Sequence, residues 1–178
     1  MRLFIAINFS DMVMNALCET VSELRDVARK GRFPLRENLH LTLVFIGESE
    51  RVDDILDVME DVAAEAFLEP IDITLSGAGV FPGRGGDLHW VGVENTPALS
   101  RLARRLSEEL REEDFRIEKR RFTPHITIGR QVVLGACADI KVHPASMKAD
   151  HISLMRSDRA GGRPVYTEIA AVPCGLAP

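Results

Sequence analysis

The sequence predicts an α+β protein with two related lobes, each a small β-sheet backed by helices. Two observations carry this prediction. Segments with strand-like alternation are interleaved with segments of helical periodicity along all 178 residues, a length that can bury a substantial core. In addition, one strand pattern at positions 39–43 returns at positions 124–128, about 85 residues later. No Ser/Gly-rich linker separates the two halves, so we expect a single bilobal domain spanning residues 1–178.

The first half is predicted to form a strand, a helix, a second strand and a second helix. Their ranges are 2–8, 11–30, 39–46 and 51–67. Ser10 and Ser49 can cap the two helices, Gly31 can end the first helix, and Gly47 can end the second strand. Apolar residues of the first helix share one stripe at helical spacing, at Met14, Leu17, Val21, Leu24 and Val27.

The second half is predicted to contain one helix and several strands. The expected segments are strands at 71–81 and 88–93 joined by a Gly-rich turn at 82–86, a helix at 97–113, strands at 115–118 and 124–129, and closing strands at 152–155 and 165–172 separated by a loop at 158–164. The strands that carry the recurring pattern are expected to place their apolar side on the helices and their polar side in a shared groove.

The recurring pattern is His-x-Thr, and it lies in the segments Leu39-His40-Leu41-Thr42-Leu43 and Pro124-His125-Ile126-Thr127-Ile128. In a strand, alternate side chains share a face, so each histidine points the same way as its threonine. With five His and seven Thr in the chain, random placement gives only about 0.2 such patterns. Two imidazoles with hydroxyl partners on rigid strands are the groups needed for paired acid and base catalysis without a metal.

The other three histidines are weaker candidates for catalysis. His151 precedes Ile152-Ser153, a similar pattern that the residues alone do not exclude. His89 and His143 are expected to be structural or exposed. Half-buried strand histidines bonded to threonine are also the alternative interpretation of the His-x-Thr pair itself.

Composition and charge restrict the class of protein. The net charge of −5 argues against wrapping long nucleic acid, but local arginines could hold a small or terminal phosphate. Basic residues cluster at Lys119-Arg120-Arg121 with Arg130, and again at Arg156, Arg159 and Arg163. The chain has no segment of about 20 apolar residues and no signal-peptide pattern, so a cytoplasmic protein is expected. Three widely spaced cysteines, Cys18, Cys137 and Cys174, predict reduced thiols rather than disulfides or metal ligands.

These motifs resemble the two-histidine phosphoesterases, specifically the bacterial and archaeal RNA 2′,3′-cyclic phosphodiesterases, also called 2′-5′ RNA ligases. The resemblance extends through most of the chain, over 2–7, 38–48, 79–82, 88–93, 121–130 and 162–166. It implies a bilobal fold with two pseudo-symmetric, largely antiparallel sheets and a central groove. It also implies hydrolysis of 2′,3′-cyclic phosphates to 2′-phosphates with no metal or other cofactor. His151 lies outside both motif contexts. The turn at 83–86 has fewer bulky residues than the family pattern.

The chemistry gives each candidate residue a role. Guided by the resemblance, we assign His125 as the general base on water and His40 as the general acid on the 3′-oxygen, although the reverse assignment is equivalent in the sequence. Thr42 and Thr127 are expected to donate hydrogen bonds to the nonbridging phosphoryl oxygens. Arg130 is a candidate phosphate clamp or a surface ion pair.

Aromatic residues near the motifs have more than one interpretation. Phe45 is expected to be core, since simple alternation places it with Leu41 and Leu43. Trp90 and Tyr166 could stack on a base or pack in the core.

Other functions remain open at this point. The protein could instead be a 2′-5′ RNA ligase, a hydrolase of small cyclic phosphates, or a noncatalytic module that binds RNA ends or nucleotides. We expect a monomer that acts on RNA ends or nucleotides with a 2′,3′-cyclic phosphate and does not bind membranes.

Overall fold

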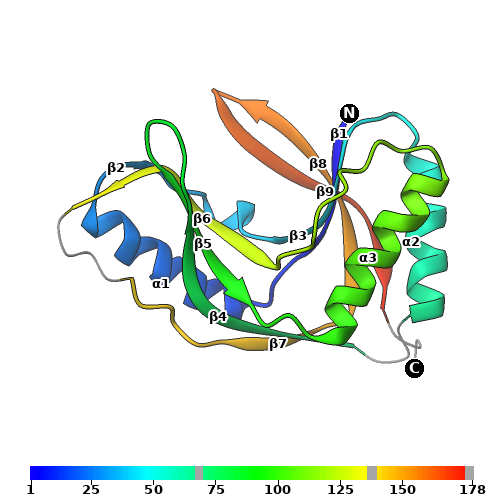
Figure 1. Ribbon diagram of the computed structural model, residues 1–178, viewed down its shortest axis with the longest axis horizontal. Coiled ribbons are helices and arrows are strands. Elements are labelled where there is room, and N and C mark those ends of the chain that lie inside the picture. Colours follow the sequence, from blue (N-terminus) through cyan, green and yellow to red (C-terminus); the bar gives the residue numbers. More distant parts are fainter. Residues whose placement is uncertain (67–69, 136–139, 175–178) are drawn as a thin grey trace.

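The computed structural model describes residues 1–66, 70–135 and 140–174, and within them the chain forms two antiparallel sheets and three α-helices (Figure 1). The four-stranded sheet has the order β3-β1-β8-β9, with β1 at Arg2–Ile7, β3 at Leu41–Glu48, β8 at His151–Ala160 and β9 at Arg163–Pro173. The five-stranded sheet has the order β2-β6-β5-β4-β7, with β2 at Ala28–Arg32, β4 at Ile71–Phe81, β5 at Asp87–Val93, β6 at His125–Leu134 and β7 at Ser146–Ala149. The predicted α+β class with two sheets is confirmed.

The two sheets do not correspond to the two halves of the sequence. The C-terminal strands β8 and β9 return to the sheet of β1 and β3, where β8 pairs directly with β1. Conversely, β2 from the first half pairs with β6 in the other sheet. Each sheet therefore contains one of the two motif segments, but the chain crosses between the sheets more than once.

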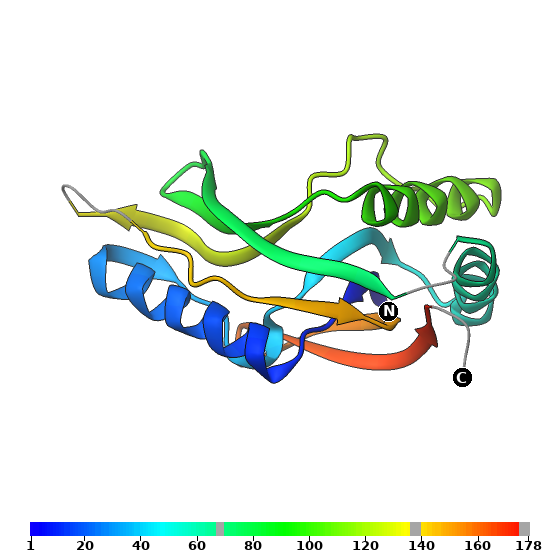
Figure 2. The ribbon, with the colours of Figure 1, turned by 90° about the horizontal axis from the view of Figure 1, so that it is seen from below.

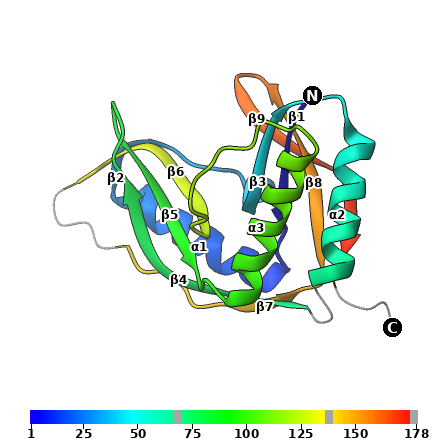
Figure 3. The ribbon, with the colours of Figure 1, turned by 45° about the vertical axis from the view of Figure 1, so that its right-hand side comes forward.

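The helices lie at opposite ends of the molecule. Helix α1 (Asp11–Val27) packs on β6 and β2 of the five-stranded sheet, whereas α2 (Val52–Ala66) and α3 (Pro97–Glu112) lie side by side at the other end (Figures 1, 2 and 3). Helix α2 contacts β9, and α3 contacts β3. Among the described helices, none is long and apolar enough to cross a membrane.

The apolar sides of both motif strands lie in a continuous core. Leu41 and Leu43 of β3 are buried, as are Ile126 and Ile128 of β6, and all four belong to the same hydrophobic cluster. This burial satisfies the alternation in the sequence, because the threonines between these residues remain partly exposed on the other side. The core therefore fixes which face of each motif strand is turned away from it.

The first predicted helix is too long. It ends at Val27, and the residues that follow turn into β2 because their backbone pairs with β6. Ser10 occupies the N-cap position of α1 without a side-chain cap bond, while Ser49 Oγ accepts a hydrogen bond of 3.1 Å from Arg51 N ahead of α2. The predicted end of the second helix at Phe67 lies outside the described residues.

Several predicted boundaries in the second half also differ. The segment 115–118 is irregular rather than a strand, although Phe115 and Ile117 are buried. Strand β7 was not predicted at all. The predicted loop at 158–164 belongs largely to a long β8–β9 hairpin, whose tight turn is formed by Gly161 and Gly162, both with positive φ.

The first motif segment also differs at its start. Leu39 and His40 precede β3 rather than lying in it, after a short 3₁₀ helix, η1 (Arg36–Asn38). His125, in contrast, is the first residue of β6.

Cys18 and Cys174 are free thiols, and burial raises the pKa of Cys174 to about 11. Cys137 lies outside the described residues.

Candidate active site

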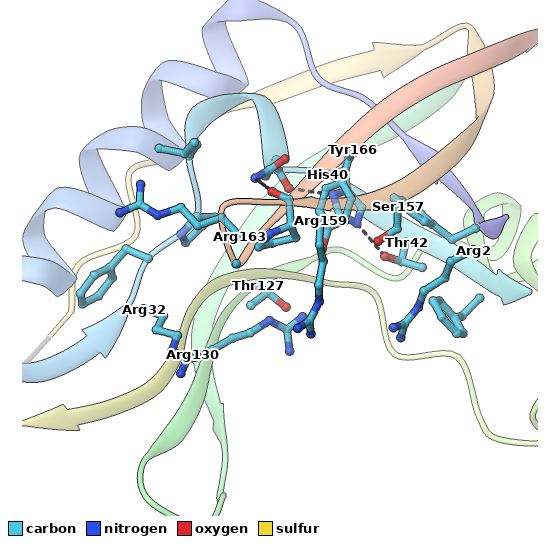
Figure 4. A pocket seen from close by; sticks show the side chains of 18 of the residues that line it. Arg2, Arg32, His40, Thr42, Thr127, Arg130, Ser157, Arg159, Arg163 and Tyr166 are labelled. Atoms are coloured by element: carbon cyan, nitrogen blue, oxygen red, sulfur yellow. Dashed lines mark hydrogen bonds between the residues drawn. The ribbon is translucent and has the colours of Figure 1, made fainter. Parts of the chain in front are cut away.

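A central groove of about 980 Å³ brings the two motif segments together. Its walls come from both sheets and from the residues around η1 (Figure 4). The four-stranded sheet contributes Arg2, Phe4, Thr42, Phe45, Arg159 and Tyr166, and the five-stranded sheet contributes Arg32, His125, Thr127 and Arg130. His40, which lies just before β3, lines the same groove.

His40 is held at both ring nitrogens. Its Nδ1 lies 2.8 Å from the main-chain oxygen of Asn38, and its Nε2 lies 3.0 Å from Thr42 Oγ1. Because a carbonyl oxygen only accepts hydrogen bonds, Nδ1 carries a proton and donates a hydrogen bond to the Asn38 carbonyl. Asn38 is itself buried, and its Nδ2 donates a 3.0 Å hydrogen bond to the main-chain oxygen of Pro164 at the start of β9. The β8–β9 hairpin thereby supports the segment that orients His40.

His125 has a matching anchor. Its Nδ1 lies 2.7 Å from the main-chain oxygen of Thr123, again two residues earlier in the chain. Nδ1 must therefore donate here too, which leaves Nε2 of both histidines as the nitrogen that can exchange a proton with a ligand. Within the described residues, Thr127 makes no hydrogen bond to the His125 ring, unlike Thr42 and His40.

Each histidine also lies among aromatic rings. The His40 ring centroid is 4.8 Å from that of Phe4 and 5.1 Å from that of Tyr166, which meets it edge-on. The His125 centroid is 5.4 Å from that of Phe81 and 6.2 Å from that of Trp90. These apolar neighbours restrict the orientations of both imidazoles.

Of the two candidate stacking residues, Tyr166 lines the groove and Trp90 does not. Trp90 packs closely over Gly79 of the adjacent strand, where an added Cβ would lie 2.0 Å from its ring. The glycine therefore makes room for the indole, and Trp90 supports the His125 side of the groove from within the sheet.

A β-bulge follows the threonine in each motif strand. In β3, Thr42 and Val44 face successive residues of β1, so Leu43 is the additional residue. In β6, Thr127 and Gly129 face successive residues of β5, so Ile128 is the additional residue. A bulge changes which side chains face each way beyond it. The residue three positions after each threonine therefore faces the groove rather than the core.

These residues are Phe45 in β3 and Arg130 in β6, and both line the groove. The expectation that Phe45 is core is wrong: the bulge leaves it 43% exposed, with the guanidinium of Arg2 above its ring at 4.9 Å. Arg130 would point away from the groove in a regular strand, and the bulge in β6 is what brings it there. Figure 4 shows Arg130 extending from β6 toward the middle of the groove.

The groove is strongly basic in a protein with a net charge of −5. Six arginines line it, and none of its described lining residues is Asp or Glu. They are Arg2, Arg25, Arg32, Arg130, Arg159 and Arg163. Within the described residues, none of these six forms an ion pair, whereas Arg156 pairs with Asp158 and Arg120 with Glu118. The groove therefore presents uncompensated positive charge, which suits an anionic ligand.

Burial lowers the pKa of His40 below its ordinary value, and the positive charge of Arg130 lowers it further, while the Asn38 carbonyl opposes the shift. Arg130 lies on β6 of the five-stranded sheet, whereas His40 directly precedes β3 of the four-stranded sheet. The two halves of the groove are therefore coupled electrostatically.

The remaining histidines lie elsewhere. His151 Nδ1 pairs with Asp150 Oδ1 at 2.7 Å, and His143 lies between Glu19 and Glu23 of α1. His89 is buried on the side of β5 opposite Trp90, and burial lowers the pKa of its ring although Asp87 opposes the shift. None of the three lines the groove. The described residues contain no cluster of three or more His, Cys, Asp or Glu side chains arranged to hold a metal ion.

Sequence reasoning identified part of this lining. It named both histidines, both threonines, Arg130 and the Arg159–Arg163 region. It missed Arg2, Arg25 and Arg32, because their place in the groove depends on how β1, α1 and β2 pack against the motif strands. The alternation in Arg2-Leu3-Phe4, with Leu3 fully buried, was the available signal that Arg2 and Phe4 share a face away from the main core.

Comparison with known proteins places this arrangement in a family. A family model described as the 2′-5′ RNA ligase superfamily matches residues 14–161. The RNA 2′,3′-cyclic phosphodiesterase of Methanothermobacter thermautotrophicus is 31% identical over 181 residues, covering 94% of this chain and 96% of that protein. The RNA 2′,3′-cyclic phosphodiesterase of Archaeoglobus fulgidus is 36% identical over 132 residues, covering 73% and 72%. The crystal structure of E. coli LigT complexed with 3′-AMP superimposes with a TM-score of 0.80 at 25% identity, covering 98% of each chain. The chain belongs to the 2′-5′ RNA ligase superfamily.

Proposed function

We propose that this protein is an RNA 2′,3′-cyclic phosphodiesterase that opens 2′,3′-cyclic phosphate ends to 2′-phosphates. The observation that carries the proposal is the matched pair of histidines in one basic groove, each with Nδ1 bonded to a main-chain carbonyl; Nε2 of His40 contacts only the Thr42 hydroxyl among the described residues. Relatives that share about a third of its residues over most of the chain bear the name of this activity. A noncatalytic binding module would need the arginines but not this pair of oriented imidazoles.

The proposed reaction is an attack by water on the phosphorus of the cyclic ester. His125 Nε2 takes a proton from the water as its oxygen bonds to phosphorus, and His40 Nε2 gives a proton to the departing 3′-oxygen as the P–O3′ bond breaks. The product then carries the phosphate on its 2′-oxygen. Thr42 and Thr127 donate hydrogen bonds to the nonbridging oxygens, and Arg130 offsets their developing negative charge.

The acid role requires a protonated His40, although burial lowers its pKa in the free protein. A bound phosphate brings a negative charge into the groove, which counters the effect of Arg130 and raises the pKa of His40 again. We therefore propose that the substrate itself promotes protonation of the acid, so that His40 is neutral before binding and charged after it.

The proposal extends to the oligomeric state and the domain organisation of the protein. Both histidines come from one chain, and a single hydrophobic cluster contains the apolar residues behind both motifs. We infer that the chain acts as a monomer and as one bilobal domain. Light scattering during gel filtration tests the monomer, and a single unfolding transition tests the domain.

The direct test is incubation of a short RNA ending in a 2′,3′-cyclic phosphate with the protein and excess chelator. The expected product is the 2′-phosphate, formed at an unchanged rate when chelator is present. A 3′-phosphate product would reverse the leaving-group assignment, and no turnover on any cyclic phosphate would favour the binding module. Rapid turnover of small cyclic phosphates alone, with RNA ends untouched, would favour the small-molecule hydrolase.

Ligation is the second candidate, because the matched family model carries the name of that activity. The same groups would act with a ribose 5′-hydroxyl in place of water, and the product would be a 2′-5′ phosphodiester. Adding an RNA with a free 5′-hydroxyl to the same assay distinguishes the two outcomes, since ligation lengthens the RNA and hydrolysis does not.

A further inference from the structure

A second, smaller pocket of about 470 Å³ adjoins the central groove. We call it the side pocket. Arg32 and Arg130 line both spaces, so the two spaces meet at these side chains, which lie near each other in Figure 4. The remaining walls come mainly from the β4–β5 turn, with Phe81, Arg84 and Leu88. The chemistry proposed above uses none of these turn residues.

The charge of the side pocket suits a phosphate. Three arginines line it, and no Asp or Glu is among its described lining residues. The nearby carboxylate of Asp87 is engaged in the turn, where its Oδ1 accepts a hydrogen bond of 3.2 Å from Gly83 N. Within the described part of the chain, Arg32, Arg84 and Arg130 form no ion pair with a carboxylate, so their positive charges are available to a ligand.

The side pocket also offers an exposed aromatic ring close to His125, the proposed general base. Phe81 is 40% exposed, and its ring centroid lies 5.4 Å from that of His125, with the two planes nearly perpendicular at 89°. An exposed aromatic side chain beside basic groups is the usual combination for holding a nucleobase together with its phosphate.

The turn that carries Arg84 is fixed against β6 rather than projecting alone. Gly86 has a φ of +129°, and an added Cβ would lie 2.5 Å from the main-chain carbon of Gln131. Gln131 itself has a φ of +52°, at a second irregularity of β6 next to Arg130. The close packing of these two backbones sets the position of the turn relative to Arg130.

We propose that the side pocket is a subsite for the nucleotide adjacent to the cyclic end of an RNA strand. Arg84 and Arg32 bind the phosphodiester that joins this nucleotide to the terminal one, and its base stacks on Phe81. This inference rests on the proposed function and specifies its substrate class, because an enzyme with such a subsite acts on RNA ends in preference to cyclic mononucleotides.

The experiment compares two substrates, a 2′,3′-cyclic mononucleotide and a short RNA with the same terminal nucleotide. The wild-type kcat/KM is expected to be at least about tenfold higher for the RNA, the effect of one stacked base and its phosphate. Arg84→Gln should lower the ratio of the two kcat/KM values about tenfold. Arg101→Gln removes the same charge from an exposed position on α3, outside both pockets, and should leave both rates and their ratio unchanged. Equal kcat/KM values for both substrates, or a ratio that Arg84→Gln leaves unchanged, would overturn the subsite.

A binding measurement separates failure of the subsite from failure of the catalytic proposal. Fluorescence anisotropy with a labelled RNA that ends in a 2′-phosphate requires no turnover. Arg84→Gln should weaken binding and reduce the slope of log affinity against log salt concentration by about 0.7, as expected for the loss of one single-strand phosphate contact. Arg84-dependent binding without hydrolysis would uphold the subsite and refute the enzyme.

The competing use of the side pocket is to hold a second RNA with a free 5′-hydroxyl. In a ligation assay, that arrangement would make Arg84→Gln raise the KM of the 5′-hydroxyl RNA and leave the KM of the cyclic-phosphate RNA unchanged. This result would overturn the assignment to the adjacent nucleotide. The reverse pattern supports it.

Discussion

The two motif segments share three features but differ in their surroundings. Each has a histidine with Nδ1 bonded to the carbonyl two residues earlier, a threonine on the groove side and a bulge directly after that threonine. They differ at the residue that the bulge turns into the groove, which is the apolar Phe45 in β3 and the cationic Arg130 in β6. They also differ in hydrogen bonding, since only Thr42 bonds to its histidine among the described contacts.

This difference gives the two histidines of the repeat different surroundings. His40 is enclosed, bonded at both nitrogens and subject to the charge of Arg130 from the opposite sheet, and its pKa is lowered. The repeated elements thus place two similar imidazoles, and the side chains outside the repeat give each imidazole different neighbours. The proposed acid and base must be in opposite protonation states when they act on one phosphorus.

The largest expected effect is loss of either imidazole. His40→Ala and His125→Ala should each lower kcat by about 10² to 10⁴-fold, because each removes a proton-transfer group. The double variant should fall far less than the product of the two losses, since the residues act as a unit. Steady-state hydrolysis of a cyclic-phosphate RNA measures this. A single variant with near wild-type turnover would show that the pair does not act together.

The next largest effect is expected for Arg130, which lies on the five-stranded sheet and lowers the pKa of His40 on the other side of the groove. Arg130→Gln should raise KM about tenfold through loss of a charge-assisted phosphate contact. It should also raise the pKa of His40, because the positive charge that disfavours its protonated form is gone. Titration of the His40 ring by NMR follows the shift directly. Unchanged titration would show that the opposite sheet has no influence on His40.

The threonines should show a smaller and unequal effect. Thr42→Val and Thr127→Val should each lower kcat/KM about tenfold, as expected for a lost hydrogen bond to a charged phosphoryl group. Only Thr42→Val should also change the pH profile, since of these two threonines only Thr42 bonds to a histidine ring nitrogen among the described contacts. Kinetics from pH 5 to 9 with both variants tests the asymmetry, and equal shifts in both profiles would contradict it.

The smallest effect is on stability. A histidine whose folded pKa lies below its unfolded value of about 6.5 makes the unfolded state bind more protons near that pH. The free energy of unfolding is therefore retained above pH 6.5 and declines as the pH falls below it, toward the folded pKa. His40→Ala should make this decline shallower by less than about 1.4 kcal/mol per pH unit. The remaining decline should include His89, whose pKa burial also lowers. Urea denaturation at several pH values measures the slope of the free energy of unfolding against pH for the wild type and the variant. An identical slope in the variant would show that His40 does not contribute to the pH dependence of stability.

Local pattern predicted the elements that have one buried face. The stripe of α1 and the alternation around Leu41 and Ile126 gave the correct helix and strands, because burial of apolar side chains decides both. The end of α1 was wrong, since the residues after Val27 form a strand only through pairing with β6. Strand β7 was missed for the same reason, because its place depends on its antiparallel partner β4. The cytoplasmic location stays a prediction from the sequence.

The candidate site shows the same limit. The His-x-Thr repeat was visible because its members lie two residues apart, whereas the bulges after Thr42 and Thr127 are features of pairing with β1 and β5. Simple alternation therefore placed Phe45 in the core and left the orientation of Arg130 open. Groove residues on distant elements, such as Arg2 and Arg32, become neighbours only when the two sheets come together.

The most direct test of the two unequal roles uses a cyclic phosphate in which sulfur replaces the 3′-oxygen. A thiolate leaves without needing a proton, so general acid catalysis contributes little with this substrate. On it, His40→Ala should recover to within about tenfold of the wild-type rate, while His125→Ala should stay reduced by at least about 10²-fold. Recovery of His125→Ala with no recovery of His40→Ala would contradict the assignment of acid and base to the two halves of the groove.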